Sequence, residues 1–402
     1  MTTNYDNVKN YNKTLYACFV GYIVQAIVNN FVPLLFLTFH HTYQIPMSKI
    51  TMLITINFVL QLLIDLLSAG FIDRIGYRMA VLLAHFCAST GLVLLVVLPE
   101  ICPDAFLGIL IAVMVYAVGG GLLEVLVSPI VEACPTENKE AAMSLLHSFY
   151  CWGHVGVVLL STVFFSVFGI EHWRILALLW ALIPLFNGIF FTKVPIASLM
   201  EDGENGLSFL ELVRKREFWI FMIFMVCAGA SEQAVSQWAS TFSEMGLGVT
   251  KTVGDLAGPM SFAVFMGTAR LLYGKYGEKL KLELAMFASV FLCCIAYLVI
   301  SLVPNAVIGL TACSLCGFSV GILWPGTFSL SAKAIPKGGT VLFALLALAG
   351  DLGCAGGPTL VGAVAGLYKD NLRVGILAAT VFPLLLLIGI VLISKYKGIK
   401  KS

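Results

Sequence analysis

The chain has 402 residues, of which 59% are hydrophobic and only 11% are Asp, Glu, Lys or Arg, and its net charge at pH 7 is +2. Soluble domains carry about 25% charged residues, so this composition excludes an ordinary soluble protein and indicates a polytopic membrane protein. The small net charge gives no reason to expect a nucleic-acid partner. Most of the eleven cysteines lie in or beside apolar segments, so we expect buried thiols, with no disulfide framework and no metal site.

Twelve apolar segments are long enough to cross a bilayer, which takes about 20 residues each. They lie at 15–39, 50–72, 79–98, 105–131, 141–168, 173–192, 218–242, 255–276, 282–303, 306–332, 340–366 and 372–394. The longest internal polar stretch divides them into two sets of six. We therefore predict an all-α membrane protein with an N-terminal bundle at 1–195, a cytoplasmic linker at 196–217 and a C-terminal bundle at 218–402.

The basic residues predict the orientation of the chain. With both termini in the cytoplasm, 18 of the 24 Lys and Arg residues fall inside, five fall outside, and Arg270 remains within a span. Cytoplasmic loops carry the excess of Lys and Arg in membrane proteins. We therefore expect a multi-pass protein of the plasma membrane with both termini in the cytoplasm.

The turns after the second and eighth spans, at 69–78 and 274–280, align with one another. Each places an acid before a base at the same point of its half: Asp73 and Arg74 in the first, Glu278 and Lys279 in the second. Such a repeat is typical of transporters built from two related bundles.

The fourth span contains a single acid, Glu124. Tyr116, Gly120, Glu124 and Ser128 recur every four residues and so share one helix face, and Gly119–Gly121 would let a neighbouring helix approach closely. A charge at the bilayer centre costs about 2.5–3.5 kcal/mol on insertion scales, which favours a functional role in proton coupling. The alternative is a protonated or paired acid with a structural role only.

Other polar and aromatic side chains cluster on the first, fifth, seventh and tenth spans. Amides donate and accept hydrogen bonds toward hydroxyl groups, and an aromatic ring packs on the apolar face of a sugar. The candidate substrate-binding residues are Gln25, Asn29, Asn30, His147, Gln233, Gln237, Trp238 and Trp324, and Glu232 is a second proton-coupling candidate. For Arg270 and Asp351 we expect structural pairing with one another or with neighbours.

The turn at 69–78 resembles the signature between the second and third helices of the major facilitator superfamily, although Ala69 and Tyr77 depart from it. The resemblance covers the whole chain and implies two pseudo-symmetric six-helix bundles that rock around a central cavity. It also implies a cytoplasmic gate, to which we assign Asp65, Asp73, Arg74, Gly76, Arg78, Glu278 and Lys279.

Residues 121–129 also resemble the fourth-helix pattern of the fucose and glucose proton-symporter group, with Ser128 in place of Asn. The acid and Trp at Glu232 and Trp238 resemble a seventh-helix pattern of related permeases. Asn29 and Asn30 match the start of that group's first-helix pattern, but its membrane aspartate is absent. A two-carboxylate coupling arrangement is therefore not carried over intact.

The leading hypothesis is a proton-coupled transporter of a sugar or related polar metabolite, acting as a monomer without a cofactor. A proton-driven efflux antiporter for drugs or metabolites is the alternative, since the aromatic share of 12% and the 13 methionines suit a broad apolar cavity. A membrane sensor that binds ligand without moving it is a third hypothesis. An enzyme is not expected, because no nucleophile–base pair, metal cluster or phosphate loop emerges.

Overall fold

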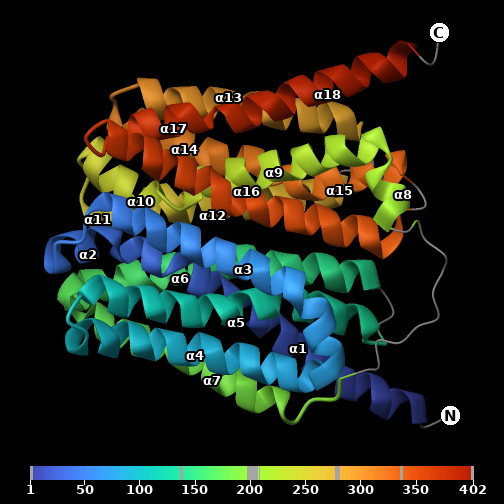
Figure 1. Cartoon of the computed structure of the whole chain (residues 1–402), viewed down its shortest axis with the longest axis horizontal. Helices are drawn as coiled ribbons and strands as arrows, with labels where there is room; N and C mark the ends of the chain where they lie inside the picture. The colour runs from blue at the N-terminus through green and yellow to red at the C-terminus, as the bar shows by residue number, and fades with distance from the viewer. Residues whose placement is uncertain are drawn as a thin grey trace. The chain divides into compact units, whose positions relative to one another are not determined.

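The computed structural model forms two compact units, Met1–Glu201 and Asp202–Ser402 (Figure 1). The residues that it describes are 3–135, 139–196, 207, 209–276, 281–335 and 338–399. The boundary between the units falls within the segment predicted as a linker, 196–217. Every regular element in the described residues is a helix, which confirms the predicted all-α class.

The helices of the first unit follow the predicted spans closely. In chain order they are α1 (Thr3–Asn30), the 3-10 turn Val32–Leu35, α2 (Phe36–Tyr43), α3 (Met47–Ile75), α4 (Tyr77–Ile101), α5 (Ala105–Ala133), α6 (Lys139–Phe168), the 3-10 turn Ile170–His172 and α7 (Trp173–Phe191).

The second unit is more interrupted. Its helices are α8 (Phe209–Val213), α9 (Arg216–Ser236), α10 (Ala239–Thr241), the π-helix Phe242–Gly246, α11 (Lys251–Asp255), the π-helix Leu256–Met260, α12 (Ser261–Tyr276), α13 (Leu282–Leu302), α14 (Ala306–Val320), α15 (Leu323–Ala334), α16 (Gly339–Leu367), α17 (Leu372–Ala379) and α18 (Val381–Ile399).

The two units repeat the same set of helix neighbours. In the first unit α1 packs on α6, α3 on α5, α4 on α5, and α4 on α7. In the second unit α9 packs on α16, α12 on α14, α13 on α14, and α13 on α17 and α18. These are equivalent pairs when α9 is taken as the counterpart of α1, so the predicted pseudo-symmetry of two six-helix bundles is confirmed.

Eleven helical segments within the described residues are long and apolar enough to cross a membrane. The predicted span at 255–276 is not among them, and it consists of the π-helix Leu256–Met260 followed by α12. This segment also carries Arg270, which lowers its hydropathy.

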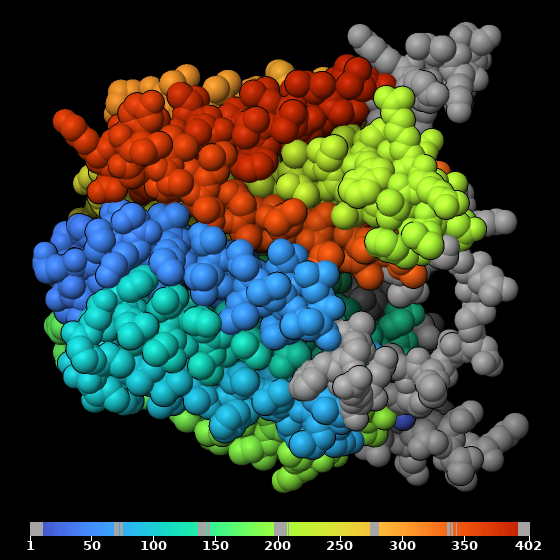
Figure 2. Space-filling view, in the orientation of Figure 1, coloured from blue at the N-terminus to red at the C-terminus, as the bar shows by residue number. Residues whose placement is uncertain are grey.

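One face of α4 shows how a span meets lipid. Its exposed large apolar side chains recur every three to seven residues: Met79, Leu83, Phe86, Val93, Val97 and Ile101. The small residues Ala80, Ala84, Ala88 and Gly91 line the buried face toward α5. Figure 2 shows α4 at the surface of the first unit, and the apolar stripe is the pattern expected of a helix whose outer face is solvated by lipid.

Glycines permit close approach of α9 and α16. A Cβ atom built on Gly229 would collide with the carbonyl oxygen of Gly350. A Cβ atom on Gly353 would collide with the carbonyl of Val226, and one on Gly357 would lie 2.5 Å from that of Ala230. Small residues at such crossings bring helix backbones into van der Waals contact.

We expect Gly353→Ala to lower the thermal unfolding temperature of the purified protein, because the added methyl group would overlap the Val226 carbonyl. Overpacking of this kind costs about 1–3 kcal/mol. Gly356→Ala is the matched control, since a Cβ atom there meets nothing within 4 Å and alanine is the better helix former. An equal effect of the two substitutions on the unfolding temperature would contradict this explanation.

Candidate functional site

The half-buried acid of α5, Glu124, is hydrogen-bonded to α1. The Nε2 atom of Gln25 donates a hydrogen bond to Oε2 of Glu124 at 2.7 Å, and Gln25 is only 4% exposed. One helical turn before Gln25 in α1 and one turn after Glu124 in α5, the hydroxyl groups of Tyr22 and Ser128 lie 2.9 Å apart. Two residues of the predicted α5 face, Glu124 and Ser128, therefore meet α1 through polar contacts.

The three glycines before Glu124 bring α5 against its neighbours on two sides. A Cβ atom on Gly119 would lie 2.6 Å from the carbonyl oxygen of Ala84 in α4. One on Gly121 would lie 3.0 Å from Cα of Gln61 in α3. The close approach expected from the sequence is confirmed, and it places the glycine-containing face of α5 beside Gln61 of α3.

Asn29 is the centre of an amide network between α1 and α3. Its Oδ1 atom accepts hydrogen bonds from Nε2 of Gln61 at 2.8 Å and from Nδ2 of Asn57 at 3.3 Å. Asn30 differs, because its Nδ2 donates to the carbonyl of Ala26 within its own helix at 2.9 Å. Of the two predicted asparagines, Asn29 belongs to the interhelical network, whereas the donor group of Asn30 is used within α1.

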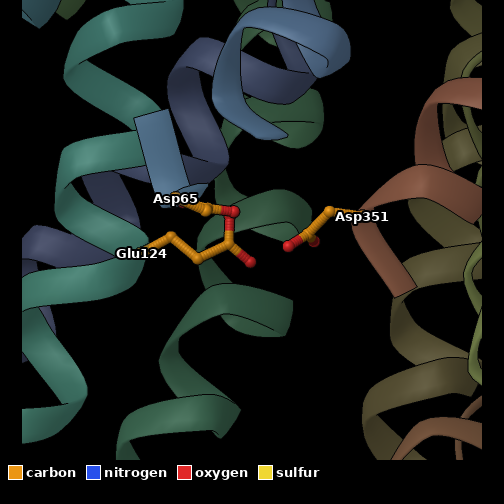
Figure 3. A group of neighbouring side chains, drawn as sticks. All are labelled: Asp65, Glu124 and Asp351. Carbon is orange, nitrogen blue, oxygen red and sulfur yellow. The ribbon is translucent and has the colours of Figure 1, made fainter. Parts of the chain in front are cut away.

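Asp65 lies beside Glu124. Carboxylate oxygens of the two residues lie within 4.8 Å of one another, and Figure 3 shows their carboxyl groups side by side, Asp65 from α3 and Glu124 from α5. The sequence grouped Asp65 with the gate because Asp73 is two helical turns away. That gate role stays a prediction, and the packing of α3 on α5 adds a contact that the linear sequence did not indicate.

His147 of α6 contacts the same region from a third helix. Its ring centroid lies 5.5 Å from that of Tyr22, and its side chain is exposed in the structure. The first unit thus brings together Gln25, Asn29 and His147 with Glu124 across α1, α5 and α6. Asn57 and Gln61 were not among the predicted binding residues, although their four-residue spacing with Asp65 was the signal that could have identified them.

In the second unit, Glu232 of α9 forms an ion pair with Arg270 of α12. The Oε2 atom of Glu232 lies 3.3 Å from Nη2 of Arg270, and Glu232 is 8% exposed. Gln233 donates to Glu232 Oε1 at 3.4 Å, and Gln237 donates to Oε1 of Gln233 at 3.1 Å. Structural pairing of Arg270 was expected, and Glu232 is the acid that provides it.

The two predicted aromatic ligands pack against α16. The indole Nε1 of Trp238, which is 1% exposed, donates to the carbonyl of Pro358 at 3.0 Å. The ring of Trp324 occupies the space that a Cβ atom on Gly350 would need, and its side chain is half-buried. Both rings therefore have a packing role in the structure, and ligand contact by either one stays a prediction.

At the predicted gate, Gly76 joins α3 to α4 with a φ of +78°, a conformation that L side chains rarely adopt. The guanidinium of Arg78 donates to three carbonyl oxygens at the end of α7: Phe191 at 2.7 Å, Thr192 at 3.2 Å and Val194 at 2.9 Å.

Four other predicted gate residues lie outside what the structure describes. Side chains of Asp73 and Arg74, and all of Glu278 and Lys279, lie beyond the described parts of the chain.

The described helices form two repeated bundles, and in each bundle an acid contacts an amide: Glu124 contacts Gln25, and Glu232 contacts Gln233. The family model of the Major Facilitator Superfamily matches residues 15–358, so the chain belongs to that superfamily. The membership confirms the prediction of a multi-pass transporter rather than an enzyme.

Solved structures support the same fold at low sequence identity. The E. coli fucose:proton symporter FucP is 16% identical, with 95% of this chain and 98% of that chain covered and a TM-score of 0.66. The nucleoside transporter NupG is 12% identical over 94% and 99%, with a TM-score of 0.73. A bacterial homologue of the human lysosomal transporter Spinster is 13% identical over 96% and 97%, with a TM-score of 0.74. Comparison with curated protein sequences gave no significant match.

We expect Arg78→Lys to lower the unfolding temperature by about 4 °C or more, nearly as much as Arg78→Gln does. The reason is that the single ammonium group of lysine cannot replace the planar guanidinium, which donates hydrogen bonds to three carbonyl oxygens. The measurement is thermal unfolding in detergent. Lys193→Gln, an exposed basic residue at the same end of α7, should leave the temperature unchanged. Full retention of stability by Arg78→Lys would show that charge alone matters.

Proposed function

We propose that this protein is a secondary active transporter that moves a small polar solute, a sugar or related metabolite, across the plasma membrane by alternating access coupled to protons. The single observation that carries the proposal is the contact between buried Gln25 and the half-buried acid Glu124. It joins a titratable group to a hydrogen-bonding group suited to a hydroxylated ligand. A proton and a solute would then bind within one helix pair.

The amide-rich surroundings of Glu124 favour a polyhydroxylated solute. Gln25, Asn29 and Gln61 each donate or accept through a planar amide, and all three are buried. Amides serve hydroxyl groups in either direction, and a solute would exchange these interhelical bonds for bonds to itself. The names of the similar structures FucP and NupG, a fucose:proton symporter and a nucleoside transporter, agree with this class of solute.

In the proposed cycle, Glu124 takes up a proton from the outside, which removes a charge from an apolar span and permits closure around the solute. Release of the proton into the cytoplasm resets the carrier. Moving one charge across the membrane is worth about 2.3 kcal/mol per 100 mV, which is enough to accumulate a neutral solute. Glu232, in the second unit, is proposed to assist proton transfer.

The efflux antiporter is the second candidate, and the Asp65–Glu124 contact favours it. Two carboxyl groups whose oxygens lie within 4.8 Å repel one another when both are ionised. A cationic solute would relieve that repulsion in place of a proton. A drug or amine exchanged for protons is therefore the natural alternative to a neutral sugar.

We expect Glu124→Gln to abolish accumulation of the solute against its gradient while counterflow exchange continues, because a neutral amide mimics the protonated acid permanently. The assay is uptake into proteoliposomes with and without a proton gradient. Glu132→Gln, which removes an exposed acid from the same helix, is the matched control. Undiminished accumulation by Glu124→Gln would exclude Glu124 as the coupling site.

We expect a thermal-shift screen of the purified protein to give its largest stabilisation with a sugar, and a larger one at pH 5.5 than at pH 7.5. The panel contains sugars, polyols, nucleosides, amino acids and cationic drugs. Binding linked to proton uptake is tighter at the acidic pH, and a bound ligand raises stability by mass action. Stabilisation by bulky cations alone would favour the antiporter.

A further inference from the structure

The tenth span of the chain, which belongs to the second unit, is interrupted between α14 and α15, and its sequence explains the interruption. α14 ends at Val320 and α15 begins at Leu323. In a continuous helix the carbonyl of Gly321 would accept a hydrogen bond from the amide of residue 325. Residue 325 is Pro325, which has no N–H to donate. A carbonyl within an apolar span is thereby left without its helical donor.

Arg270 supplies the missing donor from a different helix. Its Nε atom donates to the Gly321 carbonyl oxygen at 3.2 Å. The approach depends on glycine, since a Cβ atom on Gly321 would lie 2.8 Å from both Cβ of Ala269 and the carbonyl oxygen of Met266. α12 therefore lies against the break itself, and the residue after Ala269 reaches across it.

The same guanidinium pairs with Glu232 through Nη2 at 3.3 Å. Arg270 thus joins two features of the second unit, the acid of α9 and the broken backbone before α15. A guanidinium presents its donors in a fixed planar fork, so the direction of Nε depends on where Nη2 is held. Loss of the carboxylate charge removes the partner that fixes this direction.

We propose that Arg270 is a positioning residue that couples the charge of Glu232 to the break in the tenth span. While Glu232 is ionised, the guanidinium is held against the Gly321 carbonyl and the start of α15 is fixed. When Glu232 is neutral, this hold weakens and α15, which carries Trp324, becomes free to change its angle to α14. The contacts involved are all within the second unit and include no solute, so the test needs no substrate.

The test is hydrogen–deuterium exchange of the full-length protein in detergent, followed in peptides covering 322–330. We expect Glu232→Gln and Arg270→Gln each to accelerate exchange there by about threefold or more, since each loosens a local structure. The double substitution should exchange no faster than Arg270→Gln alone, because both act through one guanidinium. Peptides from α18 serve as the internal reference for global unfolding.

Pro325→Ala provides the decisive rescue, because it restores an amide that can donate to the Gly321 carbonyl. We expect exchange at 322–330 in Arg270→Gln with Pro325→Ala to return to within about twofold of the wild type. Pro184→Ala, which changes a helical proline in α7, should not rescue. General loss of packing would not respond to the amide at residue 325.

Two results would overturn the inference. Unchanged exchange in Glu232→Gln would separate the acid from the break, and equal acceleration by Arg270→Gln with and without Pro325→Ala would exclude the carbonyl bond. If Arg270→Gln does not fold, Arg270→Lys replaces it. Lysine keeps a positive charge for Glu232 but lacks the guanidinium fork, so it should still accelerate exchange and still be rescued by Pro325→Ala.

Discussion

Each unit stabilises an acid within its spans with a partner from its own helices: half-buried Glu124 in the first unit and buried Glu232 in the second. Glu124 accepts a hydrogen bond from Gln25, and Glu232 pairs with Arg270. An isolated charge in an apolar medium is far too costly to keep, and removal of one partner of a buried pair leaves the other uncompensated. The position of α1 against α5 is therefore set by a polar contact as well as by packing, and the Glu232–Arg270 pair joins α9 to α12.

Glycine residues let the helices beside these polar contacts approach one another closely. Gly121 brings α5 to Gln61 on α3, and Gly321 brings the tenth span to α12 at the level of Arg270. In both cases a helix must approach its neighbour more closely than a Cβ atom would allow. Apolar surface drives no association between helices within lipid, so close approach and buried hydrogen bonds together determine how these helices pack.

The two units use their acids differently. The first unit surrounds Glu124 with neutral amides and places Asp65 nearby, an arrangement that suits reversible protonation beside a hydroxylated ligand. The second unit gives Glu232 a permanent positive partner, which is itself bonded to an interrupted helix. A proton-sensitive binding region in one bundle and a charge-sensitive bend in the other would together provide the two functions that coupled transport requires, ligand capture and conformational change.

The sequence by itself determined the membrane class, eleven of the twelve predicted spans, the repeat of two bundles and the polar candidates, because hydropathy and charge along the chain depend only on local composition. It identified Glu124 and the glycines beside it, but not the partners of either. Tertiary structure decided that Gln25 bonds to Glu124, that Asp65 lies with Glu124, and that Glu232 pairs with Arg270. The physical reason is that helix rotation and register determine which polar faces meet, and these depend on contacts between residues far apart in the chain.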